Sequence, residues 1–114
     1  MPMANAPMMP AKAALAAMHR GDLLAAYDIA ERALREAPDD LELKYLSVLA
    51  LARSGATEPA SKRFERLGLG KAGTAQGHLA IDIPALAARL AKDRALNAEQ
   101  PERTRLLLHA SAPL

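Results

Sequence analysis

Apolar residues recur along this chain at the spacing of helices rather than strands. In segments 11–36 and 41–67 they fall three and four positions apart with charged residues between them, the pattern of a helix that buries one face. Segment 82–97 repeats the pattern, with an apolar face that includes Ile83, Leu86 and Leu90. A last apolar segment, 101–111, begins at a proline. The pattern predicts an all-α protein.

Glycine, proline and aspartate mark the ends of these helices. Gly21 and Gly55 each follow an apolar helical pattern and precede a residue able to cap the next helix, Asp22 or Thr57, so each predicts a tight turn between antiparallel helices. Pro38 ends a helix, and the aspartates after it cap the next one. In the same way, Pro59 is expected in the first turn after Thr57. Further along, Asp82 is the expected N-cap of the helix 82–97, with Pro84 in its first turn.

The turns belong to an internal repeat. A single offset, the one that takes Gly21 to Gly55, also aligns Ala26 with Ala60. The alanines lie one turn into the second helix of each pair, where a small side chain lets the first helix approach closely. The same register aligns Leu15 with Leu49, Ala17 with Leu51, Ala30 with Phe64 and Ala33 with Leu67.

These residues resemble the tetratricopeptide repeat family, whose unit of about 34 residues is a helix, a turn with Gly, and a second helix that carries small residues and ends at Pro. The stretch "GDLLAAYDIAERALREAPDD" matches the second half of that unit through Gly21, Ala26, Ala33, Leu34 and Pro38, and the second copy keeps Gly55, Ala60 and Phe64. The resemblance covers roughly residues 8–69. The stretches "VLALARSGATEPASKRFERLGL" and "DIPALAARLAKDRAL" also resemble the tetratricopeptide-type segment that accompanies effector domains, including nucleotidyl cyclases, in some bacterial signalling proteins.

The resemblance implies a TPR-like α-solenoid of antiparallel helical hairpins. Its expected parts are a disordered tail 1–10, repeat one at about 11–40, repeat two at about 41–69, a linker 68–80, and capping helices 82–97 and 101–111. A cap is expected because each repeat of a solenoid buries its apolar face only against a neighbour.

Composition narrows the classes of function. Fifteen Lys and Arg against 13 Asp and Glu give a formal charge of +2, and the signs are interspersed, so no nucleic-acid-binding face is expected. The chain has no Cys, which excludes disulfides and thiolate zinc sites. The stretch "MPMANAPMMP" lacks the basic region of a secretory signal, and no stretch approaches the roughly 18 apolar residues of a membrane span. We expect a cytoplasmic protein that binds no membrane.

Gly68, Gly70 and Gly73 have the G-x-G-x-x-G spacing of a dinucleotide-binding loop. That fingerprint requires a preceding strand, whereas the segment before Gly68 has the period of a helix. We interpret the glycines as a helix C-cap and a hinge, mobile from about Gly68 to Gly77.

The other candidate chemistry is equally sparse. The three histidines, His19, His78 and His109, are not at metal-ligand spacings, and no serine has the flanking glycines of a hydrolase. We therefore expect no cofactor, no metal and no catalysis. The carboxylates form i, i+4 pairs typical of exposed helix faces: Asp28 with Arg32, Glu31 with Arg35 and Glu58 with Lys62.

The resemblance also points to a partner-binding groove lined by the first helix of each repeat. The matching positions are Leu15, Met18 and His19 in the first copy and Glu42, Tyr45, Leu49 and Arg53 in the second. Tyr45 and Arg53 lie two turns apart, and both residue types are common at binding hot spots. The alternative stays open that Tyr45 packs against the third unit and that Arg53 is merely exposed.

We therefore expect a non-catalytic adaptor of the bacterial cytoplasm that binds a peptide or helix of another protein. The alternative is a structural role, either self-association through the last apolar helix or a place within a larger signalling protein. A nucleotide-dependent enzyme is the third hypothesis. The residues that tetratricopeptide domains use to clamp a chaperone's C-terminal carboxylate are absent from the matching positions.

Overall fold

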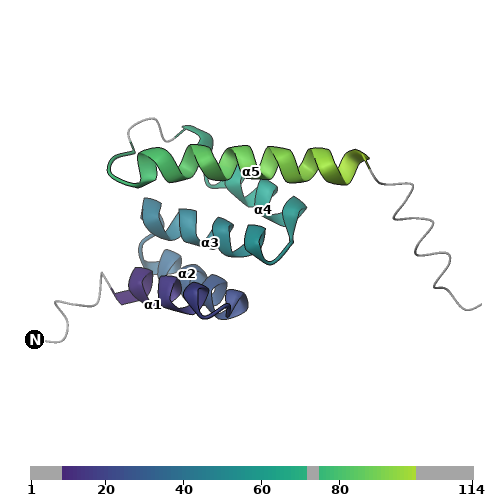
Figure 1. Ribbon diagram of the computed structural model, residues 1–114. Coiled ribbons are helices and arrows are strands. Elements are labelled where there is room, and N and C mark those ends of the chain that lie inside the picture. The colour runs from purple at the N-terminus through teal and green to yellow at the C-terminus, as the bar shows by residue number, and fades with distance from the viewer. Residues whose placement is uncertain (1–8, 72–74, 100–114) are drawn as a thin grey trace, which may run out of the picture.

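The computed structural model describes residues 9–71 and 75–99. They form five α-helices and a short 3-10 helix (Figure 1): α1 (Met9–His19), α2 (Leu23–Glu36), α3 (Leu41–Arg53), α4 (Thr57–Arg66), η2 (Leu69–Lys71) and α5 (Leu79–Glu99). The all-α prediction is confirmed. The first helix begins at Met9, inside the expected tail, and the expected helix 101–111 lies outside the described residues.

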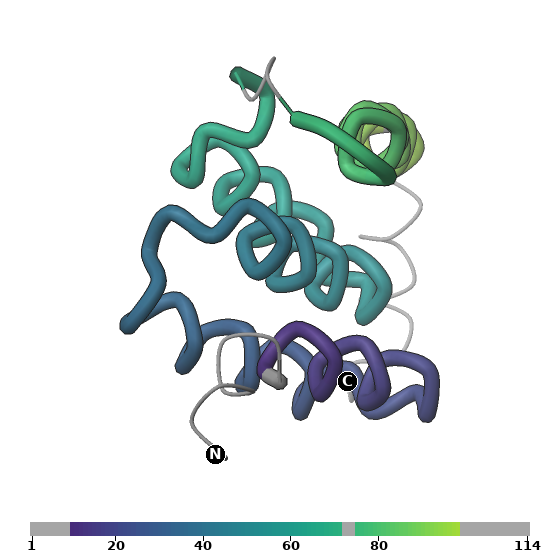
Figure 2. Tube along the Cα trace, turned by 90° about the vertical axis from the view of Figure 1, so that its left-hand side faces the viewer, coloured from purple at the N-terminus to yellow at the C-terminus, as the bar shows by residue number. Residues whose placement is uncertain are grey.

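The helices pack in the order of the sequence. α1 packs against α2 and α3, and α3 and α5 both pack against α4. Figure 1 shows α1 and α5 on opposite sides of α3, and Figure 2 shows the same stacking with α5 nearly end-on at the top. The first helices of the successive pairs therefore lie side by side, in the order α1, α3 and α5.

The two hairpin turns have the same structure at equivalent positions of the repeat. Gly21 and Gly55 have φ of 82° and 90°, a conformation that only glycine adopts without strain. Gly21 donates its N–H to the carbonyl three residues earlier at 3.0 Å, and Gly55 does so at 3.1 Å. The next amides, of Asp22 and Ala56, reach the carbonyl five residues earlier at 2.9 and 3.0 Å. Each turn is a Schellman motif, which ends one helix as it starts the next.

The expected helix caps are confirmed at the first two positions and wrong at the third. Asp22 accepts from the N–H of Ala25 at 3.3 Å, and Asp40 accepts from that of Leu43 at 3.0 Å. At α4 the cap position is Ala56, which has no side-chain acceptor, and Thr57 is instead the first helical residue. Thr57 is only 8% exposed, so its side chain is buried and makes no capping hydrogen bond.

The start of α5 also differs from expectation. The helix begins at Leu79, so Asp82 lies within its first turn rather than at the cap, and Pro84 lies inside the helix beyond that turn. A strict continuation of the repeat would start this helix at Ala75, the position equivalent to Leu41. The third unit is thus set back by a longer connection than the one between the first two.

That connection contributes to the core. Gly68, with φ of 72°, follows the last residues of α4, which confirms its role as a helix terminator. The segment before it is helix α4 and not the strand of a dinucleotide-binding unit. Leu69 in η2 is 1% exposed, which the interpretation of this stretch as a hinge did not anticipate. Residues 72–74 lie outside the described part of the chain, so mobility there stays a prediction.

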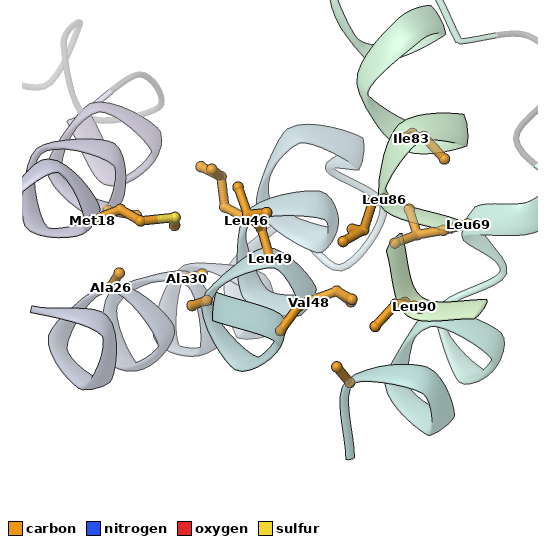
Figure 3. Packing of buried hydrophobic residues seen from close by; sticks show 14 of the residues in the cluster. Met18, Ala26, Ala30, Leu46, Val48, Leu49, Leu69, Ile83, Leu86 and Leu90 are labelled. Carbon is orange, nitrogen blue, oxygen red and sulfur yellow. The ribbon is translucent and has the colours of Figure 1, made fainter. Parts of the chain in front are cut away.

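The core is built on alanines where helices cross and on leucines between them. Ala26 and Ala60, the pair predicted to permit close approach, are both fully buried at 0% exposure. In Figure 3, Met18 of α1 points toward Leu46 of α3, and the leucines of α5 lie against α3 and η2. Because both alanines are fully buried in a packed core, a larger side chain at either position has to displace its neighbours.

We predict that Ala26→Leu and Ala60→Leu each lower the free energy of unfolding by about 1–3 kcal/mol, because the added carbons force apart helices already in contact. The measurement is chemical denaturation followed by circular dichroism.

Ala88→Leu is the matched control, since Ala88 is exposed on α5. It should change the free energy of unfolding by no more than about 0.5 kcal/mol. Equal effects at the buried and the exposed alanines would contradict close packing at the crossings.

Candidate functional site

One side of α3 carries the second set of predicted binding residues. Glu42, Tyr45, Leu49 and Arg53 are spaced by three or four positions and so share one side of the helix, which we call the α3 face. Glu42 and Tyr45 are half-buried, and Arg53 is exposed. Leu49 is only 8% exposed and belongs to the core, so little of its surface is accessible to a partner.

The first set of predicted residues, on α1, divides in the same way. Leu15 is 41% exposed and His19 is exposed at the end of the helix. Met18 is 3% exposed and belongs to the core between α1 and α3. The surface that α1 adds beside the α3 face therefore consists of Leu15 and His19.

The other neighbour of the α3 face is α5, which contributes residues that the sequence analysis did not assign to it. The His78 ring lies between two carboxylates, with Nδ1 2.8 Å from Oδ2 of Asp82 and Nε2 2.9 Å from Oε1 of Glu42. His78 thereby ties the start of α5 to the start of α3. The i, i+4 spacing of His78 and Asp82 is visible in the sequence, whereas the contact with Glu42 depends on the fold.

These contacts favour the charged form of the imidazole. The hydrogen bond to Asp82, followed by the hydrogen bond to Glu42 and the charge of Glu42, raises the pKa of His78 above its ordinary value of 6.5. A protonated ring donates to both carboxylates at once. The link between α3 and α5 is thus strongest when His78 is charged.

Tyr45 lies within the electrostatic influence of the same groups. Burial raises the pKa of the Tyr45 phenol above its ordinary value of 10.0, with a further contribution from the charge of Asp82 and an opposing one from Arg53. At neutral pH the phenol is therefore a neutral hydrogen-bond donor. Along α3 the face thus begins with the acidic Glu42 beside His78, has Tyr45 in the middle and ends at Arg53.

A second polar cluster joins α2, α3 and α4. Arg63 of α4 donates to the Ser47 hydroxyl at 3.0 Å, pairs with the Glu31 carboxylate, and lies 5.4 Å from the centre of the Tyr27 ring. The Tyr27 hydroxyl in turn donates to Glu31 at 3.0 Å. The expected pairing of Glu31 with Arg35 is wrong, because the fold brings a cation from the next hairpin within reach. The groups of this cluster satisfy one another, which marks it as structural.

Of the two remaining expected ion pairs, one forms and the other does not. Arg32 and Asp28 form the predicted pair at 3.5 Å, and both side chains are well exposed. Glu58 does not pair with Lys62 but with Arg94 of α5 at 3.2 Å. A helical i, i+4 pair therefore forms where no other charge is close, and a residue of a neighbouring helix displaces it elsewhere.

Within residues 9–71 and 75–99, no group of three or more His, Asp or Glu side chains is placed to hold a metal ion. Over the same residues, every helix is too short or too polar to span a bilayer. Comparisons of the chain with protein-family models, curated proteins and solved structures find no match.

The His78 contacts predict a pH dependence of stability. Because the folded pKa lies above the unfolded one, the stabilisation by His78 is fully present below about pH 6.5 and is lost as the pH rises through the folded pKa. The difference in denaturation midpoint between the wild-type protein and His78→Ala should be larger at acid pH than at alkaline pH.

A direct check is the NMR titration of the His78 ring. Its pKa should lie above 6.5 in the wild-type protein and fall in the Asp82→Asn variant, which removes the principal hydrogen-bond acceptor. A stability difference that grows with pH, or a pKa that Asp82→Asn leaves unchanged, would contradict the geometry.

For the second cluster, we predict that Arg63→Met lowers the free energy of unfolding by about 2 kcal/mol, since it leaves the carboxylate of Glu31 partly buried without its cation. Arg32→Met is the control, because both members of its pair are exposed, at 75% and 63%. It should cost no more than about 0.5 kcal/mol. Similar denaturation midpoints for the two variants would show that the Arg63 cluster does not hold the hairpins together.

Proposed function

We propose that the chain is a TPR-like helical-repeat domain whose function is to bind a segment of another protein, without catalysis of its own. The segment lies along the α3 face, with α1 and α5 as the neighbouring helices. The observation that carries the proposal is the spacing of Tyr45 and Arg53, which lie two turns apart on one side of α3, with Tyr45 half-buried and Arg53 exposed.

The repeat geometry supports this class of protein. The two hairpin turns share backbone hydrogen bonds, glycine conformation and a buried alanine at equivalent positions of the repeat. An array of this kind packs neighbour on neighbour and leaves the first helices of its hairpins side by side. Such a row of helices is an extended surface, suited to an extended or helical peptide rather than to a small molecule.

The chemistry of the face indicates what such a segment should contain. Glu42 and Asp82 favour a basic group near the start of α3, whereas Arg53 favours an acidic group about three turns further along. Tyr45 between them offers an aromatic surface and a neutral hydroxyl donor, as binding hot spots often do. The complementary segment carries a cation, an apolar residue and a carboxylate in that order along α3.

The proposal predicts that replacing both Tyr45 and Arg53 by alanine weakens binding to an identified partner by at least about tenfold, because hot-spot side chains contribute more than about 1.4 kcal/mol each. The partner is captured from native cells with the full chain, identified, and then titrated as a purified protein by calorimetry. Unchanged affinity of the double variant would reject the α3 face as the binding site.

The control is a double replacement of Asp28 and Arg32 by alanine. It removes an exposed pair from α2, away from the α3 face, and should leave the affinity within about twofold of wild type. Circular dichroism of both variants would separate lost binding from lost folding.

A further inference from the structure

A groove runs between α4 and α5 on the side of α5 away from His78. It consists of two adjoining hollows of about 380 and 140 Å³, which share Phe64 of α4 and Ala87 of α5 as lining residues. Its α5 wall is a single stripe at helical spacing, from Ala80 through Ala87 to Arg94. We call this the α4–α5 groove.

The α4 wall of the groove contains an unsatisfied polar group. Ser61 is 5% exposed, and its hydroxyl has no hydrogen-bond partner among the described residues. Buried hydroxyls in folded proteins are nearly always paired. The Ser61 oxygen is itself covered by protein, so a group in the groove would bond to it only after the serine side chain rotates.

The repeat shows what kind of occupant this wall accepts. Ser61 and Glu65 are the repeat equivalents of Tyr27 and Glu31, in the register that aligns Ala26 with Ala60. In α2, Tyr27 and Glu31 receive Arg63 from the second helix of the following hairpin. Ser61 and Glu65 thus present on α4 the same stripe that binds the next second helix in line. The occupant that fits is a helix with an arginine.

The sequence directly after α5 has these properties. Segment 101–111, "PERTRLLLHAS", combines Arg103 and Arg105 with three consecutive leucines. It follows α5, which ends at Glu99, close to the Arg94 end of the groove. As a single helix the segment would be about 16 Å long. Because α5 ends at Glu99, a segment that turns back there runs beside roughly the last 11 residues of α5. It therefore reaches the smaller hollow, which Ala91 and Arg94 line.

We propose that segment 101–111 folds back on its own chain as a helix antiparallel to α5 and occupies the Arg94 end of the α4–α5 groove. Its leucines cover Phe64 and Ala91, and Arg103 or Arg105 pairs with Glu65 as Arg63 pairs with Glu31. This docking does not depend on the function proposed for the α3 face. It closes the apolar end of the array within one molecule.

The absence of native cysteines allows a direct test by disulfide formation in the full chain. Ala91→Cys in the groove is combined in turn with Leu106→Cys, Leu107→Cys and Leu108→Cys, three positions that together sample all sides of a helix. Since a disulfide requires Cα atoms within about 7 Å, at least one pair should close under mild oxidation. Arg89→Cys, about 200° around α5 from Ala91, is the control partner and should close with none.

The cross-linked product should be a monomer, identified by its mass and by the linked peptides. Failure of all three Ala91→Cys pairs, or equal closure with Arg89→Cys, overturns the proposal. Closure only as a disulfide-linked dimer also overturns it, because it assigns the groove to the segment of a second copy.

A second measurement does not depend on cross-linking. Changing Leu106, Leu107 and Leu108 together to serine should lower the Tm by several degrees and speed amide exchange along the groove stripe of α5. Leu24→Ser is the control, since Leu24 is 80% exposed on α2, and should leave both unchanged. A triple variant that behaves like the Leu24→Ser control, in stability and in exchange, would show that the segment does not dock.

Discussion

The contact that the rest of the structure depends on is the crossing of two helices over an alanine within each hairpin. Ala26 and Ala60 have no exposed surface, and a methyl side chain at a crossing lets two helix backbones approach closely. Close approach brings many weak dispersion contacts within range, and these stabilise the helices more than the modest area of an alanine suggests. Close approach also restricts the angle between the two helices of a hairpin. The turns at Gly21 and Gly55 have the same backbone conformation and so connect the two helix pairs in the same way.

Polar side chains form specific contacts between one helix pair and the next. Arg63 reaches from the second hairpin to Glu31 of the first, and His78 joins α5 to Glu42 of α3. The apolar core runs through the whole array, but these two contacts have directional geometry that apolar packing lacks. The alanine crossings thus shape each unit, and the charged contacts orient one unit on the next. The α3 face includes Glu42, which contacts His78. Its shape therefore depends on the charged contacts as well as on the alanine crossings.

The features foreseen from the sequence are those decided by nearby residues. A left-handed glycine ends a helix and an aspartate such as Asp40 caps the next whatever surrounds them, and the helices and turns followed from such signals. The errors involve residues whose partners are distant in the chain. Thr57 is buried and Glu31 pairs with Arg63 of the next hairpin, and neither outcome is visible from local spacing. For the same reason periodicity placed Tyr45 and Arg53 on one side of α3, whereas the approach of His78 depends on a connection that departs from the repeat.

The stripe of Tyr27 and Glu31, presented again by Ser61 and Glu65, has a consequence for how such a chain could change its length. If the second helix of every hairpin carries an equivalent stripe that binds the next second helix, the stripe itself does not limit the number of hairpins. Duplication of one repeat unit would place another helix pair on the same kind of stripe and lengthen the row of first helices by one. The number of units is then open to variation, and whatever covers the last stripe sets it.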